Sequence, residues 1–204
     1  MIFTARKSPL ILPNIWDIHS AVIAQQAGFS AIGTSSAAIA AYMGVPDGEQ
    51  MPFSMLVKLV ADIRRHTDIP LTVDIEGGYS AAPEQVAENI NTLIHLGVTG
   101  INIEDSMIAG RRQLLSIEVF CHRLQQIVSN LGSAKNQLFI NARCDLFFQS
   151  NPTATEAISR AKFYQQSGVD GIFFPGLTNH NDIVHISQCS GQLIPDNKLS
   201  RFSA

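Results

Sequence analysis

The sequence predicts an α/β fold with a parallel sheet, because short apolar runs alternate with helical patterns along the chain, and the length of the repeating unit suits a (β/α)8 barrel. Several of these runs end in acidic or polar residues, which is typical of parallel strands, whose carboxyl ends gather ligands. The helix-ending glycines Gly28, Gly97 and Gly168 are 69 (97 − 28) and 71 (168 − 97) residues apart, and each interval spans two βα units. One unit thus takes roughly 35 residues and eight need roughly 280, whereas the chain has 204. We therefore expect a single barrel domain over residues 1–204 that lacks its last βα unit.

Seven strands are expected, each a short apolar run bounded by turn residues. Their ranges are 10–12, 31–35, 71–75, 100–104, 138–142, 171–174 and 192–194. Residues 195–204 show neither a helical apolar stripe nor a further strand, so we expect an atypical tail there.

Helices are expected between the strands, over residues 17–28, 52–65, 82–96, 116–131, 155–166 and 181–188. Asp17 is a typical N-cap, and Pro52 is typical of a first helical position. The helix over 82–96 carries Val86, Ile90 and Leu93 on one side, which predicts a face packed on the sheet.

Charge and composition exclude several classes of function. The chain has 14 basic and 17 acidic residues, a net charge of −3, and no interleaving of basic with aromatic residues, so a nucleic-acid partner is not expected. Two arginine pairs, Arg64-Arg65 and Arg111-Arg112, are expected on solvated surface or in a loop. No apolar run approaches the ~18 residues of a membrane span and no secretory pattern is present. A cytoplasmic location is therefore expected.

The cysteines and histidines are assigned no role in a site. Cys121, Cys144 and Cys189 are odd in number and lack paired spacing, which argues against disulfides and zinc, so we expect buried or incidental thiols. The six histidines fall on predicted helices or loops and are expected to be solvated.

Asp74 and Glu76 are the strongest candidates for a metal site. They end a β-branched strand just before two glycines, and residues i and i+2 share one face of a strand. Two acids on one face repel unless a positive charge lies between them, and oxygen-only ligation suits Mg²⁺ or Mn²⁺. An isolated pair of this kind could equally be a solvated strand end. The strands that end at Glu104 and before Asp145 repeat the pattern, which favours a site.

Seven short motifs along residues 12–193 together resemble one known superfamily. In order they are PNIWD (13–17), GTSS (33–36), GVPD (44–47), DIEGGY (74–79), IED (103–105), NARCD (141–145) and FPG (174–176). The chain resembles the isocitrate lyase and phosphoenolpyruvate mutase superfamily, particularly its phosphonomutase-like members. The resemblance implies a (β/α)8 barrel, Mg²⁺ at the strand ends, a bound 2-oxo acid or its enolate, and a homo-oligomer, usually a tetramer, built by exchange of C-terminal helices.

The resemblance also implies roles for individual residues. Those that match metal-site acids are Asp74, Glu76 and Glu104. Asp47 matches the acid that lies over the substrate, and Arg143 matches the group that pairs with a carboxylate or enolate oxygen. The residues that match the substrate-binding positions are Gly33, Ser35, Ser36 and Tyr79.

Other interpretations of these residues are open from the sequence alone. Asp47 follows Val-Pro and precedes Gly, so it also suits a plain turn. Ser35 and Ser36 also suit the cap of a short helix that begins at Ala37. Arg143 and Asp145 could form a structural ion pair, and Tyr79 could pack rather than touch a ligand.

The chain also departs from the superfamily pattern. Lyases of the superfamily carry a Lys-Lys-Cys-Gly-His loop after the fourth strand, whereas residues 106–115 contain neither Lys nor Cys, so a standard isocitrate or methylisocitrate lyase is not expected. The mutase loop pattern is incomplete, and Phe174-Pro-Gly replaces an expected histidine. The function implied is a Mg²⁺-dependent lyase or mutase that breaks or forms a C–C or P–C bond of a small 2-oxo or 2-hydroxy carboxylate through an enolate. The alternatives are an oxaloacetate-type hydrolase or decarboxylase, and a truncated relative with weak or no activity.

Overall fold

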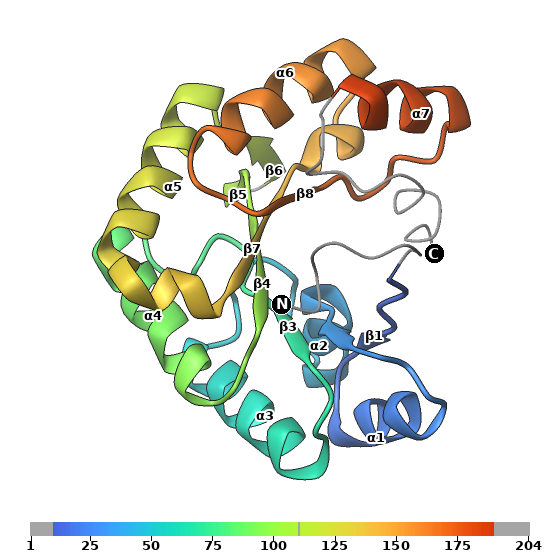
Figure 1. The fold of residues 1–204 in the computed structure, drawn as a ribbon, viewed down its shortest axis with the longest axis vertical. Coiled ribbons are helices and arrows are strands. Elements are labelled where there is room, and N and C mark those ends of the chain that lie inside the picture. Colours follow the sequence, from blue (N-terminus) through green and yellow to red (C-terminus); the bar gives the residue numbers. More distant parts are fainter. Residues whose placement is uncertain (1–9, 110, 190–204) are drawn as a thin grey trace.

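The structure is a computed structural model that describes residues 10–109 and 111–189. Its main sheet has six parallel strands in the order β1-β2-β3-β4-β7-β8. Their bounds are Asn14–Ile15 (β1), Ile32–Thr34 (β2), Leu71–Asp74 (β3), Gly100–Glu104 (β4), Phe139–Arg143 (β7) and Gly171–Phe173 (β8). The sheet is curved, and most of the described helices follow one another along its outside (Figure 1). The predicted parallel fold of the barrel type is confirmed.

Seven α-helices are described. Their bounds are Ile18–Gln26 (α1), Ser36–Met43 (α2), Phe53–His66 (α3), Pro83–His95 (α4), Ile117–Leu131 (α5), Ala154–Gln165 (α6) and His180–Cys189 (α7). Asp17 caps α1 as expected, because its side chain accepts a hydrogen bond from the Ser20 N–H at 2.7 Å. None of the described helices is both long and apolar enough to cross a membrane.

Helices α3, α4 and α5 each bury an apolar side, and strands β2 and β3 are buried on both faces. Val86, Ile90 and Leu93 of α4 are fully buried, as the sequence pattern predicts. Strands β3 and β4 pair in register, so that Asp74 lies opposite Asn102. Strands β4 and β7 bring Glu104 opposite Arg143. The pairing thereby sets the charged residues side by side at the carboxyl edge of the sheet.

The expected strand over residues 10–12 is wrong, since the first strand is Asn14–Ile15. Asn14 pairs with Gly33, and in this register residues 10–12 lie opposite residues 29–31, which precede the start of β2. These residues therefore have no strand to pair with. The expected strand over 192–194 and the tail 195–204 lie outside the described residues.

An antiparallel hairpin follows β4, where the sequence suggested only a loop. It consists of β5 (Ser106–Ala109) and β6 (Arg111–Leu114), with Ser106 opposite Leu114. Two short 3-10 helices were also not anticipated, Gly132–Gln137 (η1) and Asp145–Phe148 (η2). Among the thiols, Cys144 is buried, Cys121 half-buried and Cys189 exposed, and all three are free.

Candidate functional site

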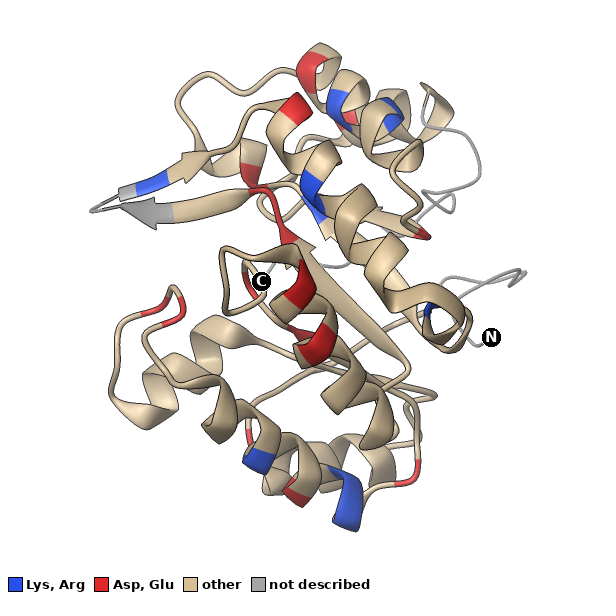
Figure 2. Cartoon of the chain, turned by 90° about the vertical axis from the view of Figure 1, so that its left-hand side faces the viewer, with Lys and Arg blue, Asp and Glu red and all other residues tan. Residues whose placement is uncertain are grey.

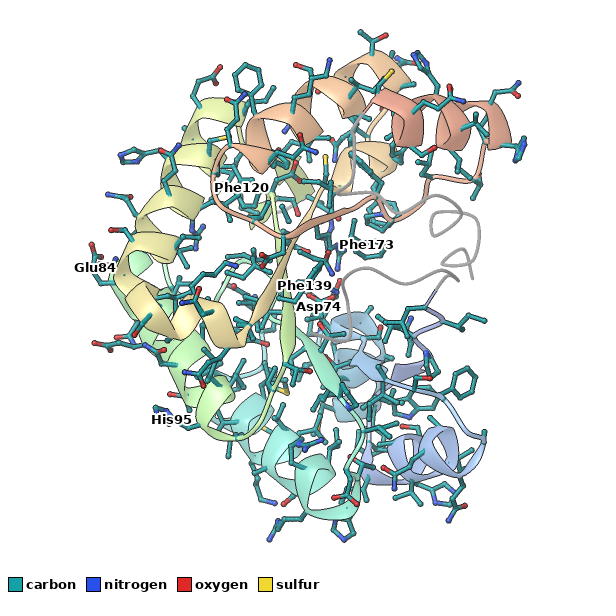
Figure 3. All side chains as sticks on the ribbon, in the orientation of Figure 1. Asp74, Glu84, His95, Phe120, Phe139 and Phe173 are labelled. Carbon is teal, nitrogen blue, oxygen red and sulfur yellow. The ribbon has the colours of Figure 1, made fainter. Side chains whose placement is uncertain are left out.

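The candidate site lies at the carboxyl ends of β3, β4 and β7, where four buried carboxylates and one buried arginine gather. The carboxylates belong to Asp74, Glu76, Glu104 and Asp145, and the arginine is Arg143. Figure 3 shows Asp74 inside the arc of helices, whereas Glu84 and His95 lie on the outer surface of α4. Parallel barrels place their ligands at this edge.

Arg143 ties three of the acids together. Its Nε donates to Asp145 Oδ1 at 2.7 Å, and its Nη1 donates to Asp74 Oδ2 at 3.0 Å. Its Nη2 lies 3.4 Å from Glu104 Oε2. Burial by itself would lower the pKa of Arg143, but the charges of these acids outweigh it and raise the pKa above its ordinary value. The ion pair with Asp145, one alternative from the sequence, is thus present, but Arg143 also contacts two of the expected metal-site acids.

Asp74 is held by groups from three other elements, β7, α2 and β2. Besides Arg143, the hydroxyl of Ser36 at the start of α2 donates to Asp74 Oδ2 at 3.2 Å, and the Asp74 N–H donates to Thr34 Oγ1 at 2.9 Å. Burial raises the pKa of Asp74, and the positive charge of Arg143 opposes that rise.

Glu76 lies in the turn after β3, with a positive φ of 51° that is uncommon for a residue other than glycine. Its Oε2 accepts a hydrogen bond from the Glu49 N–H at 2.6 Å, and the Tyr79 hydroxyl lies 3.4 Å from its Oε1. The Tyr79 N–H in turn donates to Glu49 Oε1 at 2.7 Å. Burial raises the pKa of Glu76 to about 7, and the charges of Asp47 and Asp74 add to the rise.

Glu104 is held by two side chains of the β5–β6 hairpin. Its Oε1 accepts from the Ser106 hydroxyl at 2.9 Å and from Arg112 Nη1 at 2.8 Å. Burial raises the pKa of Glu104 to about 8, although Arg143 and Arg112 act against that rise.

Arg112 is a residue of the site that sequence reasoning missed, and the expectation of solvated surface or loop is wrong for it. Its Nη1 contacts Glu104 and, at 2.5 Å, Asp145, while its Nη2 donates to Asp47 Oδ2 at 3.0 Å. The hairpin that carries it projects from the body of the molecule, and a blue segment lies in its β6 strand (Figure 2). The sequence holds one signal for the hairpin, because Gly110, a typical turn residue, separates residues 106–109 from residues 111–114. The spacing of the residues does not reveal which arginine of the pair at 111–112 contacts the acids.

The remaining predicted residues have local roles in the structure. Ser35 caps α2 by accepting from the Ala38 N–H at 3.3 Å, as one alternative supposed. Gly33 lies within β2, where a Cβ would come 3.0 Å from a methyl group of Thr72. The ring of Tyr79 packs against Phe53, with centroids 5.4 Å apart. Among the described contacts, no hydrogen bond joins Gly33 or Ser35 to the acids.

The donor set has the chemistry of a hard divalent cation site. All its acids offer oxygen, and the buried atoms Asp47 Oδ1 and Glu104 Oε2 make no hydrogen bond to any described residue. Within the described part of the chain, however, no three acidic, His or Cys side chains converge as a group that could hold a metal ion. The donors therefore fit Mg²⁺ by type, and in the structure Arg143 bridges two of them, Asp74 and Glu104.

The fold and the site together define a parallel βα protein of the barrel type with an acidic, arginine-bridged site at the carboxyl edge of its strands. Residues 3–195 match the family model described as phosphoenolpyruvate phosphomutase, and the chain belongs to this family. The resemblance inferred from the sequence motifs is thereby confirmed.

Three similar proteins illustrate the range of the family. The 2-methylisocitrate lyase of Escherichia coli K12 is 30% identical over 183 residues, which cover 85% of this chain and 60% of that protein. The oxaloacetate decarboxylase of Paraburkholderia xenovorans LB400 is 28% identical over 190 residues, which cover 89% of this chain and 62% of that protein. A crystal structure of a candidate phosphonomutase from Burkholderia cenocepacia J2315 superposes with a TM-score of 0.84 at 37% identity, covering 90% of this chain and 76% of the other. The chain thus spans about three fifths of the length of the two curated relatives.

Proposed function

We propose that the protein is a Mg²⁺- or Mn²⁺-dependent enzyme of the lyase or mutase type that acts on a small 2-oxo or 2-hydroxy carboxylate. The bond broken or formed is a C–C or P–C bond next to a carbonyl, and the reaction passes through an enolate. The observation that carries the proposal is the buried guanidinium of Arg143 among Asp74, Glu104 and Asp145. A cationic group held at a strand edge in low dielectric stabilises negative charge that develops on a substrate oxygen.

In this proposal Asp74, Glu76 and Glu104 would hold the cation, which when bound supplies a Lewis acid beside the substrate carbonyl. Arg143 pairs with a carboxylate or enolate oxygen, for which its planar fork is better suited than an ammonium group. Binding of a cation and substrate would take over contacts that Arg143 now makes with the acids.

Asp47 is proposed as the base or as the group that orients the substrate. Its Oδ1 is buried and makes no hydrogen bond to a described residue, so it is free to accept one from a hydroxyl group or a water molecule. Gly33, Ser35 and Ser36 are proposed to receive the substrate carboxylate at the start of α2, where backbone N–H groups favour an anion. Tyr79, whose hydroxyl lies near Glu76, completes the wall of the site.

An oxaloacetate-type hydrolase or decarboxylase is the second candidate. It is favoured by the 28% identity to a relative named oxaloacetate decarboxylase and by the lack of Lys and Cys in residues 106–115. Both candidates share a small carboxylate and the same acids, and both are compatible with the homo-oligomer expected from the resemblance. A catalytically weak or inactive relative is the third possibility, and the experiment below separates it from the other two.

Isothermal titration with Mg²⁺ and then with oxalate, a mimic of an enolate, tests the proposal. Oxalate should bind only after Mg²⁺, and Asp74→Ala should abolish that dependence. Asp68→Ala, which removes an exposed acid after α3, is the matched control and should bind as the unaltered protein does. A folded protein that binds neither ligand would instead support the inactive relative. A screen of 2-oxo and 2-hydroxy acids then separates lyase, mutase and decarboxylase activity.

A further inference from the structure

We propose that Arg112 is a positioning residue that holds the Asp47 carboxylate in place beside the acids at the strand ends. The effect of Arg112 on catalysis rests on the proposed function. The contact between Arg112 and Asp47 does not. It assigns a role to the β5–β6 hairpin, which the comparisons and the sequence motifs leave without one.

The first argument is that Arg112 joins three segments distant in the sequence. Nη1 contacts Glu104 at the end of β4 and Asp145 at the start of η2, and Nη2 contacts Asp47 in the segment between α2 and α3. One planar group thus bridges the strand edge and a connecting segment, and its fork fixes the direction as well as the distance of each contact.

The second argument is that the two ends of this bridge differ in burial. The Glu104 and Asp145 side chains are 3% and 0% exposed, whereas that of Asp47 is 34% exposed. Arg112 is therefore anchored by the buried acids and reaches outward to the more exposed one. The rigid end of the bridge is the strand edge, and the end that it orients is Asp47.

The third argument concerns the other oxygen of Asp47. Oδ2 accepts from Arg112, while Oδ1 is buried and makes no hydrogen bond to any described residue. The Arg112 contact is the one hydrogen bond that the described residues make to this carboxylate. Arg112 therefore fixes one oxygen and leaves the second available to a ligand, as a base held in place requires.

Other groups hold the same segment, so the contribution of Arg112 must be isolated. The Glu49 N–H donates to Glu76 Oε2, and Glu49 Oε1 accepts from Tyr79. These contacts fix the end of the segment that follows Asp47. A double-mutant cycle between Arg112 and Asp47 separates their coupling from the contribution of Glu49.

Hydrogen exchange of the amides of residues 44–51 measures this coupling without any substrate. Arg112→Met and Asp47→Ala should each speed exchange of this segment, by roughly three- to tenfold for a partly exposed charged hydrogen bond. The double variant should exchange no faster than either single variant. Unchanged exchange in both single variants, or effects that multiply in the double variant, would overturn the inference.

Two controls keep the result interpretable. Arg65→Met removes an exposed arginine of α3 and should leave residues 44–51 unchanged. The amides of α4 report global loosening, because Arg112→Met leaves Glu104 and Asp145 with less compensating charge. If the amides of α4 also exchange faster, the double-mutant cycle is repeated with Arg112→Lys, which keeps the positive charge but lacks the planar guanidinium group.

The kinetic arm distinguishes positioning from direct contact with the ligand. For any acid that the protein turns over, Arg112→Lys should lower kcat about tenfold or more and leave the oxalate Kd within about threefold. An equal loss of oxalate affinity would mean that Arg112 binds the ligand itself and would overturn the positioning role. If no acid is turned over, the proposed function fails, while the exchange cycle still decides whether Arg112 positions Asp47.

Discussion

Arg143 is buried where a cation would ordinarily be costly, and the acids around it make this possible. Three of its nitrogens face three different carboxylates at 2.7 to 3.4 Å. Such a fork cannot be reproduced by the single ammonium group of lysine, although the charge is the same.

Arg143→Lys should therefore weaken Mg²⁺-dependent oxalate binding by roughly ten- to a hundredfold, the effect of losing a charge-assisted hydrogen bond. The protein should still fold, because lysine retains the positive charge among the acids. Titration calorimetry measures the change, with Arg65→Lys as the control on the surface of α3. Equal affinities of the Arg143 variant and the unaltered protein would remove Arg143 from the ligand site.

Single residues also show where sequence reasoning reaches its limit. Asp74 and Glu104 could be selected because each is the last residue of an apolar strand, which is a local pattern. The expectation that Glu76 shares a strand face with Asp74 is wrong, because β3 ends at Asp74 and Glu76 lies in the turn that follows. Arg112 could not be selected, because its contact with Asp47 spans 65 positions and depends on how the hairpin folds back. The local pattern of residues shows where a strand ends. It does not show which arginine from a distant part of the chain contacts the acids at that end.

At the scale of elements, a buried polar cluster connects α6 to the site. The Tyr164 hydroxyl donates to Asp105 Oδ2 at 2.6 Å, and Arg160 Nη1 lies 3.2 Å from the same oxygen. Asp105 Oδ1 accepts from the Asp145 N–H at 2.9 Å. The cluster thus links α6 to the backbone of a residue that both site arginines contact.

Tyr164→Phe should lower the free energy of unfolding by about 1–3 kcal/mol, because Asp105 is fully buried and would lose a partner. Denaturant unfolding followed by circular dichroism measures the change. The neighbouring substitution Phe163→Leu, at a half-exposed position of the same helix, should alter stability by less than about 0.5 kcal/mol. Similar effects of the two substitutions would argue against the cluster as a source of stability.

The turn between β3 and α4 is another element on which the site depends. Arg123 of α5 donates from Nη2 to the carbonyl oxygens of Gly77 and Ser80, at 2.6 and 2.5 Å. Gly78 has a φ of 103°, and a Cβ there would lie 2.7 Å from a methyl group of Val86. The turn that carries Glu76 is therefore closely packed, and its residues Glu76 and Gly78 have positive φ angles.

Gly78→Ala should destabilise the protein by about 1–3 kcal/mol, because it adds backbone strain to a steric clash. Thermal unfolding checks this value, and Gly28→Ala is the control, since that glycine also has a positive φ but nothing within 4 Å of the added Cβ. The Gly28 variant isolates the backbone strain. A Gly78 variant no less stable than the Gly28 variant would mean that Val86 moves aside without cost.

The order and type of most elements could be predicted because each βα unit repeats the same local pattern. Helix α4, with its buried stripe of Val86, Ile90 and Leu93, is an example. The first strand was misplaced by a few residues, since its position depends on the register with β2 and not on its own apolar run. The hairpin was missed because residues 106–114 lack the alternation of apolar and polar residues that marks a strand pair.

At the scale of the whole molecule, the clustered acids make the stability of the protein depend on pH. The pKa values of Glu76 and Glu104 are raised from an ordinary 4.5 to about 7 and about 8. Between pH 4.5 and 8 the folded chain therefore binds more protons at these groups than the unfolded chain does.

It follows that the contribution of these groups to the free energy of unfolding, present in full below pH 4.5, is lost as the pH rises through about 7 and 8. Urea unfolding in the presence of a chelator, at a series of pH values, should show this decline. The variant Glu76→Gln, which does not titrate, should flatten the part near pH 7. A stability that rises steadily over this range would contradict the raised pKa values.

The distances along the chain between the partners of the site affect the order of folding events. Asp47 and Arg112 are 65 positions apart, and Asp74 and Arg143 are 69 apart. Contacts of such long range require the closure of large loops, which slows their formation relative to that of helices. In stopped-flow refolding, the helical signal should return before the capacity to bind oxalate, so a nascent chain would acquire its helices well before it could recognise a ligand.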